Sequence, residues 1–481
     1  MTDLVLVDPP VRLFDRLAKL EKVGSFLPSL GLCLLAAVAR KEGFSVRIID
    51  ANLLNDYSLS GFKREILKEN PKWVGFSATT LTIDAVGKIA EEIKKSCPEI
   101  LILVGGAHIT ALPFATLEKY QAVDIGVIGE GEETLRELLL FSSEGKSLCK
   151  VKGLVIRKGR KLLLTGPRQI KQKLDDLPLP AWDLLDDFPW GYRLSVNSFL
   201  KLPAAHLLTS RGCSGRCLFC DRSVFGRVPR IYSSQRVLEM IEHLVKRYQI
   251  KEIDFFDDNF LLFPKRVEEI CYGLIEKKWG LTWSCQARCD MLNSRILSLM
   301  KKAGCWQIGL GIESGSDKIL KILKKGETKD KIRRAVEIAA GLGFEVKGFF
   351  ILGNPGETEM TLKETEDFIL KLPLTYVHTT FFTPFPGSES FKIADKFGKF
   401  NFRNSWSKLG RGTVEPVFIP YGLTKKYLKD KASEIFRKFY FRPKIIFYHL
   451  KKIVFLPYLW IFYMRGFFSV ISFAKKNEKE R

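Results

Sequence analysis

The sequence predicts an α/β protein with a doubly wound parallel sheet at the N-terminus, a partial barrel of six strand–helix units, and a helical C-terminal tail. Short apolar runs alternate with helical patterns over residues 1–145 and again over residues 201–395. Such alternation favours parallel sheets covered by helices. Residues 146–200, rich in Lys, Pro and Trp, predict a linker, and the basic, aromatic-rich residues 396–481 form the predicted tail.

The first segment contains five strand patterns, at residues 4–7, 46–49, 73–76, 100–104 and 125–128, with helical patterns between them, for example at 30–41 and 83–95. Ligands of such sheets bind beyond the carboxyl ends of the strands. Glycine at these ends lets a ligand approach the backbone closely. The residues predicted to contact a ligand there are Ser77, Thr79, Gly105, Gly106, His108, Gly129, Glu130 and Gly131.

A small hairpin around Gly159 is predicted in the linker, from residues 151–155 and 161–164. Six further strands are predicted at residues 206–210, 253–256, 281–287, 307–312, 345–351 and 376–382, and helices at 235–247, 265–277, 293–302, 329–340 and 361–370. Barrel enzymes place their chemistry at the carboxyl ends of the strands.

Cys213, Cys217 and Cys220 follow the first of these barrel strands at that end. Their spacing is C-x3-C-x2-C, with Phe219 directly before the last cysteine. Three thiolates this close in sequence can hold three corners of a four-iron cluster and leave the fourth iron open to a small molecule. Three buried thiols or a zinc site are the alternatives, but zinc usually takes four ligands in paired motifs and no second pair lies nearby.

This motif resembles that of the radical S-adenosylmethionine (SAM) superfamily. The resemblance implies a [4Fe–4S] cluster on the three cysteines, SAM chelated at the open iron, and reductive cleavage of SAM to a 5′-deoxyadenosyl radical. It also implies a reducing electron donor such as flavodoxin or ferredoxin. An exposed cluster favours an anaerobic setting.

Polar groups and turns at the other barrel strand ends suit SAM. The contacts predicted are Phe219, Asp257, Asp258, Gln286, Arg288, Glu313, Ser314, Gly353 and Pro355. Alternation along a strand puts Gln286 and Arg288 on the barrel interior, with Arg288 near the SAM carboxylate, and puts Cys285 and Cys289 under the helices. Cys271 and Cys305 are also expected in the core. A solvated, helix-capping turn is the alternative for Asp257 and Asp258, Glu357 is expected to cap the next helix, and no catalytic residue is assigned.

The first segment resembles the cobalamin-binding domain that precedes many radical SAM cores. The pattern Asp-x-His-x-x-Gly is absent, and no histidine follows the first strand. The resemblance therefore implies cobalamin bound without a protein histidine on cobalt. The alternative is a nucleotide-like sheet kept as a scaffold for substrate recognition.

The formal charge of +23 is uneven, because residues 421–481 hold 15 Lys and Arg against 4 Asp and Glu. Residues 453–474 are almost wholly apolar, but Pro457 and Arg465 interrupt them. This pattern fits an interfacial amphipathic helix on an anionic membrane better than a bilayer span. A helix packed over the barrel mouth is an equal alternative, and binding to nucleic acid is the least favoured.

The ten cysteines and the absence of a secretory pattern favour the cytoplasm, with the tail favouring contact with the inner face of the membrane. We expect a radical SAM enzyme that methylates an unactivated carbon of a hydrophobic substrate (a lipid, tetrapyrrole or natural product) with the help of cobalamin. The alternatives are cobalamin-independent cyclisation, C–C coupling or oxidation and, outside enzymes, a cobalamin or iron–sulfur sensor.

Overall fold

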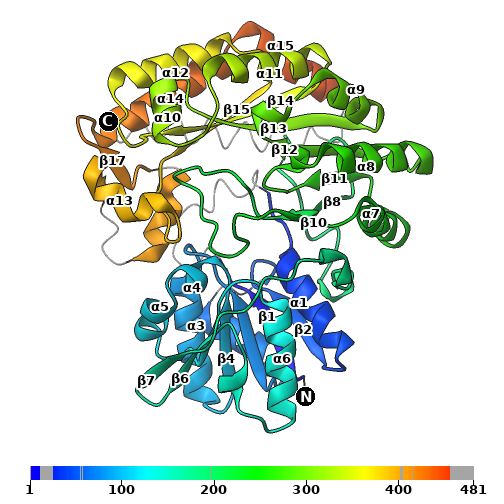
Figure 1. The fold of residues 1–481 in the computed structure, drawn as a ribbon, viewed down its shortest axis with the longest axis vertical. Helices are drawn as coiled ribbons and strands as arrows, with labels where there is room; N and C mark the ends of the chain where they lie inside the picture. The colour runs from blue at the N-terminus through cyan, green and yellow to red at the C-terminus, as the bar shows by residue number, and fades with distance from the viewer. Residues whose placement is uncertain are drawn as a thin grey trace.

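The computed structural model describes residues 2–10, 25–54, 56, 58–195, 197–400, 405–413 and 415–455. The N-terminal sheet has the strand order β2-β1-β3-β4-β5-β6-β7 (Figure 1). Its parallel strands are β1 (Leu4–Asp8), β2 (Val46–Asp50), β3 (Trp73–Ser77), β4 (Leu101–Gly105) and β5 (Ile125–Val127). The predicted hairpin forms as β6 (Leu154–Lys158) and β7 (Lys161–Leu164), which extend this sheet in antiparallel fashion.

Helices cover both faces of this sheet, as the doubly wound prediction requires. They are α1 (Leu30–Lys41), α2 (Leu59–Lys68), α3 (Ile83–Ser96), α4 (Ala107–Ala111), α5 (Pro113–Lys119) and α6 (Glu132–Ser143). The alternation of β1 decides the layers: Leu4 and Leu6 join the core under α1 and α6, whereas Val5 and Val7 join the core under α2 and α3. The predicted parallel sheet is confirmed.

The second sheet is an open, all-parallel barrel with the strand order β15-β14-β13-β12-β11-β8 (Figure 1). Its strands are β8 (Ala204–Leu207), β11 (Glu252–Phe255), β12 (Thr282–Ala287), β13 (Cys305–Glu313), β14 (Glu345–Leu352) and β15 (Tyr376–Phe381). The helices are α7 (Ser234–Tyr248), α8 (Pro264–Lys277), α9 (Ser294–Lys302), α10 (Asp317–Ile322), α11 (Lys329–Gly341) and α12 (Glu359–Lys371). A two-stranded ladder of β9 (Ser210–Arg211) and β10 (Arg230–Ile231) follows β8.

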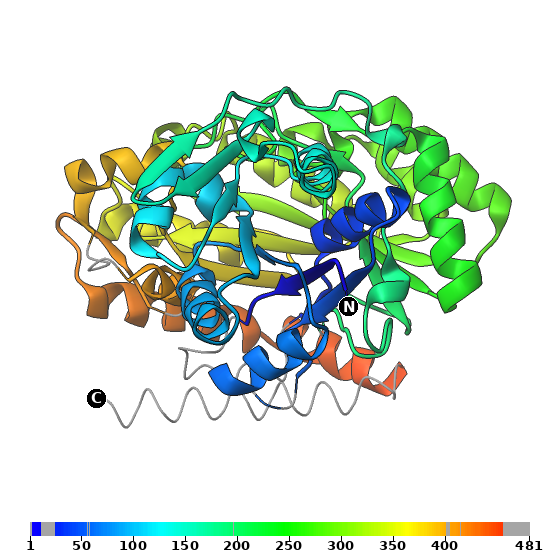
Figure 2. The same ribbon diagram turned by 90° about the horizontal axis from the view of Figure 1, so that it is seen from below.

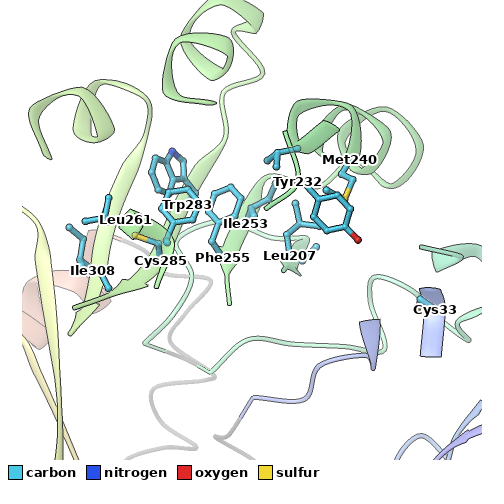
Figure 3. Close-up of a cluster of buried hydrophobic side chains, with 14 of the residues drawn as sticks. Cys33, Leu207, Tyr232, Met240, Ile253, Phe255, Leu261, Trp283, Cys285 and Ile308 are labelled. Carbon is cyan, nitrogen blue, oxygen red and sulfur yellow. The ribbon is translucent and has the colours of Figure 1, made fainter. Parts of the chain in front are cut away.

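The barrel core lies between the outer faces of the strands and the helices (Figure 3). Phe255 and Trp283 meet edge to face there, with ring centroids 5.4 Å apart. Cys271, Cys285, Cys289 and Cys305 are all buried in this core. The prediction that they pack as apolar side chains is confirmed.

The C-terminal region packs on the barrel through α13 (Glu389–Phe397), the ladder of β16 (Gly398–Phe400) and β17 (Phe418–Pro420), α14 (Lys425–Tyr440) and α15 (Pro443–Phe455). The Lys452 Nζ of α15 lies 2.9 and 3.0 Å from the Glu345 carboxylate oxygens and 3.1 Å from the Tyr376 hydroxyl. Glu345 and Tyr376 begin their strands, so α15 covers the foot of the barrel and not its mouth (Figure 2). Within the described residues no helix is long and apolar enough to cross a membrane. Most of the predicted segment 453–474 lies outside them.

Candidate functional site

The cysteine loop begins directly after the β9 strand. Gly212 adopts φ +84°, and a Cβ there would lie 3.1–3.3 Å from three backbone oxygens, so only glycine fits this turn. The Gly215 N–H lies 3.4 Å from the Cys213 sulfur, as a weak donor to a thiolate would. Cys217 is buried, whereas Cys213 and Cys220 are partly exposed. The loop thus presents three free thiols on a backbone that the β9–β10 ladder holds in place.

Positive charge lies next to these thiols. The Arg288 Nη1 is 3.9 Å from the Cys217 sulfur. Burial raises the pKa of the Cys217 thiol, and the charges of Lys325 and Arg288 oppose that rise. Burial, reinforced by the Asp258 carboxylate, raises the pKa of Cys220 to about 12. Metal ligation, which deprotonates a thiol outright, is the chemistry for which this donor set is suited.

A buried charge network supports Arg288. Its Nη2 lies 2.8 Å from Asp290 and 3.7 Å from Glu327, and it donates to the Lys325 carbonyl oxygen at 2.8 Å. The Lys325 ammonium lies 3.2 Å from Glu313 and 3.7 Å from Glu327. Glu313 has φ +69°, a left-handed conformation that is rare for a residue with a side chain. Lys325 and Glu327, between α10 and α11, were missed by the sequence analysis.

The predicted SAM residues fall into two groups. Gln286 lies near the end of β12 on the barrel interior, and Arg288 directly follows this strand. Asp258 is exposed beside Cys220, and Phe219 packs against the small core around Phe382. Asp257 and Ser314 instead have partners within the protein. The Asp257 carboxylate accepts hydrogen bonds from the Thr209 N–H and from the Thr209 and Ser210 hydroxyls, which anchors the strand leading to the cysteines, and Ser314 contacts Thr365 of α12.

The turn after β14 also differs in detail from the prediction. Gly353 has φ +78°, and both Gly353 and Pro355 are buried. The Glu357 carboxylate accepts the Gly353 and Asn354 N–H groups, the latter at 2.8 Å, and so closes this turn. Thr358 caps α12, in a capping box with Thr361. The expectation that Glu357 caps this helix is wrong, because its oxygens face the preceding turn.

A largely apolar cavity of about 1200 Å³, part of it open to solvent, lies where the carboxyl ends of the two sheets meet. Of the residues predicted from the first segment, Ser77, Gly105, Gly106, Gly129, Glu130 and Gly131 line it. The barrel side contributes Leu207, Leu208, Arg211, Val224, Phe225, Tyr232 and, from α7, Met240.

Thr79 and His108 do not line this cavity. Thr79 contacts Thr82 at the start of α3. His108 is buried on α4, with its Nδ1 3.1 Å from the Thr80 hydroxyl and its ring against Trp406. Burial lowers the pKa of His108 to about 4, so the ring is neutral.

An ion-pair network that the sequence analysis also missed joins the first sheet to the cysteine loop. The Arg211 Nη1 and Nη2 lie 2.6 and 2.5 Å from Glu130 and Glu132, and Arg230 pairs with Glu130 as well. All four side chains are largely buried: 4% of each arginine side chain is exposed, and 10–11% of each glutamate side chain. Glu130 is therefore held by two arginines at the cavity wall.

Comparisons with known proteins agree with this geometry. The family model described as "Radical SAM superfamily" matches residues 207–369, and that described as "B12 binding domain" matches residues 17–139. An uncharacterized methyltransferase of Pyrococcus horikoshii is 34% identical over 428 residues, which cover 88% of this chain and 90% of the relative. The chain belongs to the radical SAM superfamily.

Two further similarities extend over most of this radical SAM protein. An anaerobic magnesium-protoporphyrin IX monomethyl ester cyclase of Rubrivivax gelatinosus is 25% identical over 431 residues, covering 88% of this chain and 76% of the relative. The radical SAM methyltransferase TsrM of Kitasatospora setae, solved with cobalamin and a [4Fe–4S] cluster, has a TM-score of 0.69 at 18% identity, covering 92% of this chain and 90% of that one. The second similarity establishes the fold.

The cofactors of this radical SAM enzyme are a [4Fe–4S] cluster, SAM and cobalamin. The site fits them. No three His, Cys, Asp or Glu side chains among the described residues converge on a single metal ion, whereas a four-iron cluster spreads its thiolates over separate irons. At the cavity, a Cβ on Gly129 would meet no protein atom within 4 Å, so the backbone there borders open space that a ligand can occupy.

Proposed function

We propose that this enzyme transfers a methyl group to an unactivated carbon of a hydrophobic substrate, at the junction of its two sheets. The proposal is supported by residues that the cavity and the cysteine loop have in common. Arg211, Val224 and Phe225 line the cavity and lie on either side of the cysteine loop in the sequence. A corrinoid in the cavity and SAM at the cluster would then border one reaction space. When bound, the cluster and SAM supply a 5′-deoxyadenosyl radical, and the corrinoid supplies the methyl group.

The protein's own residues have three tasks in this proposal. The thiolates of Cys213, Cys217 and Cys220 hold the cluster. Arg288 and Lys325 place positive charge beside it, Arg288 within reach of a SAM carboxylate. The largely apolar lining of the cavity disfavours water, which protects reactive intermediates from side reactions.

The test needs no substrate. Reconstituted enzyme with hydroxocobalamin, a low-potential reductant and methyl-deuterated SAM should carry the labelled methyl onto the bound corrinoid and also form 5′-deoxyadenosine, both read by mass spectrometry. The Cys217→Ala variant should lose 5′-deoxyadenosine. Formation of 5′-deoxyadenosine without any label on the corrinoid would refute methyl transfer.

Radical cyclisation or oxidation is the second candidate. It is favoured by the similarity to the magnesium-protoporphyrin IX monomethyl ester cyclase, which extends over 88% of this chain. This candidate predicts 5′-deoxyadenosine as the sole nucleoside product of SAM, with no S-adenosylhomocysteine. The ratio of these two products therefore separates the candidates.

The hydrophobic substrate, contact with the inner membrane face and a flavodoxin- or ferredoxin-type donor also belong to this proposal. The large positive charge suits an acidic donor and anionic lipid. A truncation that tests the tail should end after Phe455, because Lys452 pairs with the partly buried Glu345. Loss of binding to anionic vesicles, with iron content unchanged, is expected for this truncation. Unchanged vesicle binding would contradict membrane contact.

A further inference from the structure

One side chain links the cavity to the cysteine loop. Arg211 lines the cavity and stands two residues before Cys213, separated from it only by the constrained Gly212. Its guanidinium also lies over the Phe225 ring, 5.5 Å from the centroid, on the other side of the cysteine loop. Arg211 therefore contacts the segments that enter and leave this loop.

The hydrogen bonds of Arg211 are incomplete. Both Nη atoms are paired with Glu130 and Glu132 across the junction of the two sheets. The Nε–H is buried and has no acceptor within the part of the chain that the structure describes. Leaving a buried donor unpaired is costly, and the cost is larger when the group is charged. Because Arg211 lines the cavity, an acceptor on a bound ligand is the partner that would satisfy it.

We propose that Arg211 donates this Nε–H to a carbonyl-type oxygen on the rim of the corrinoid, while its Nη atoms fix the cysteine loop to the first sheet. Cobalamin carries several carboxamide side chains whose oxygens are suitable acceptors. Arg211 is then a positioning residue, because a single guanidinium fixes the position of the corrinoid relative to the cluster. This inference rests on the binding of cobalamin in the cavity.

Arg230 provides a matched comparison. It is equally buried, shares Glu130 with Arg211 and also has an unpaired Nε. Yet Arg230 does not line the cavity, and its Nη1 donates to the Lys171 carbonyl at 2.8 Å. The β10 strand that carries it lies on the side of the barrel facing the first sheet (Figure 1). A lysine at either position keeps the charge and removes the Nε donor.

The experiment measures hydroxocobalamin affinity by equilibrium dialysis on cluster-loaded protein, for wild type, Arg211→Lys and Arg230→Lys. We expect roughly tenfold weaker binding for Arg211→Lys, as for one lost charge-assisted hydrogen bond, and binding within about threefold of wild type for Arg230→Lys. Iron content and melting temperature identify a variant that has merely misfolded.

A second readout is the EPR spectrum of the reduced cluster before and after hydroxocobalamin is added. The wild-type spectrum should shift on loading, and the shift should shrink in Arg211→Lys. Equal affinities for Arg211→Lys and wild type, or an equal loss in both variants, would overturn the role of Arg211. No binding to the wild type would instead refute cobalamin in the cavity, so the two failures are distinguishable.

Discussion

Arg288→Met tests the charge network beside the cysteines. The substitution keeps much of the aliphatic bulk but removes the guanidinium from Asp290, Glu327 and the Lys325 carbonyl. Glu327 is buried, and among the described residues it would keep only Lys325, at 3.7 Å, as an ionic partner. Breaking a buried pair by removing one partner costs about 3–5 kcal/mol. For a barrel of this size that corresponds to a melting temperature lower by about 6–20 °C.

The assay is anaerobic thermal unfolding followed by circular dichroism on cluster-free protein, so that metal release does not contribute. Arg295→Met is the control, because its pair with Glu268 at 3.2 Å involves an arginine side chain that is 83% exposed, and such pairs contribute about 0–1 kcal/mol. Equal melting temperatures for the two variants would refute the network as a support of the site.

Three other substitutions follow from the structure. Gly215→Ala places a Cβ 3.3 Å from the nearest cysteine sulfur, which should destabilise the cysteine loop by about 1–3 kcal/mol and lower the iron content per chain. In the control Gly166→Ala, the added Cβ has no atom within 4 Å, so the iron content should not change. Burial raises the pKa of Glu357 from 4.5 to about 7. Its protonated form therefore contributes stability that is fully present below pH 4.5 and is lost as the pH rises through 7. In Glu357→Gln, unfolding measured against pH should lack this loss, which amounts to up to about 3 kcal/mol. Lys452→Met should lower stability by about 3–5 kcal/mol in denaturant titrations, while exposed Lys426→Met should leave it unchanged.

Much of the fold was predictable because its signals are local. Apolar runs of strand length, separated by amphipathic helices, gave the parallel strands of both sheets, and the two-residue period of β12 placed Cys285 inside the core and Arg288 at the site. The cysteine spacing is local as well, since a cluster needs its ligands within one loop.

The parts that escaped prediction depend on contacts between distant segments. Arg211 and Glu130 are 81 residues apart, and nothing in either neighbourhood indicates the other. His108 follows β4 as predicted, but the short α4 helix turns its ring towards Trp406 and away from the cavity. Lys452 reaches Glu345 from 107 residues away, and so fixes α15 at the foot of the barrel. Only the folded chain brings these groups together.

The EPR spectrum of cob(II)alamin on the reconstituted enzyme shows whether a corrinoid lies beside the cysteine loop. We expect a spectrum without nitrogen splitting from a histidine ligand, because His108 lies outside the cavity, and faster spin relaxation when the neighbouring cluster is reduced. A histidine nitrogen splitting, or relaxation that does not change when the cluster is reduced, would contradict a corrinoid bound beside the cysteine loop.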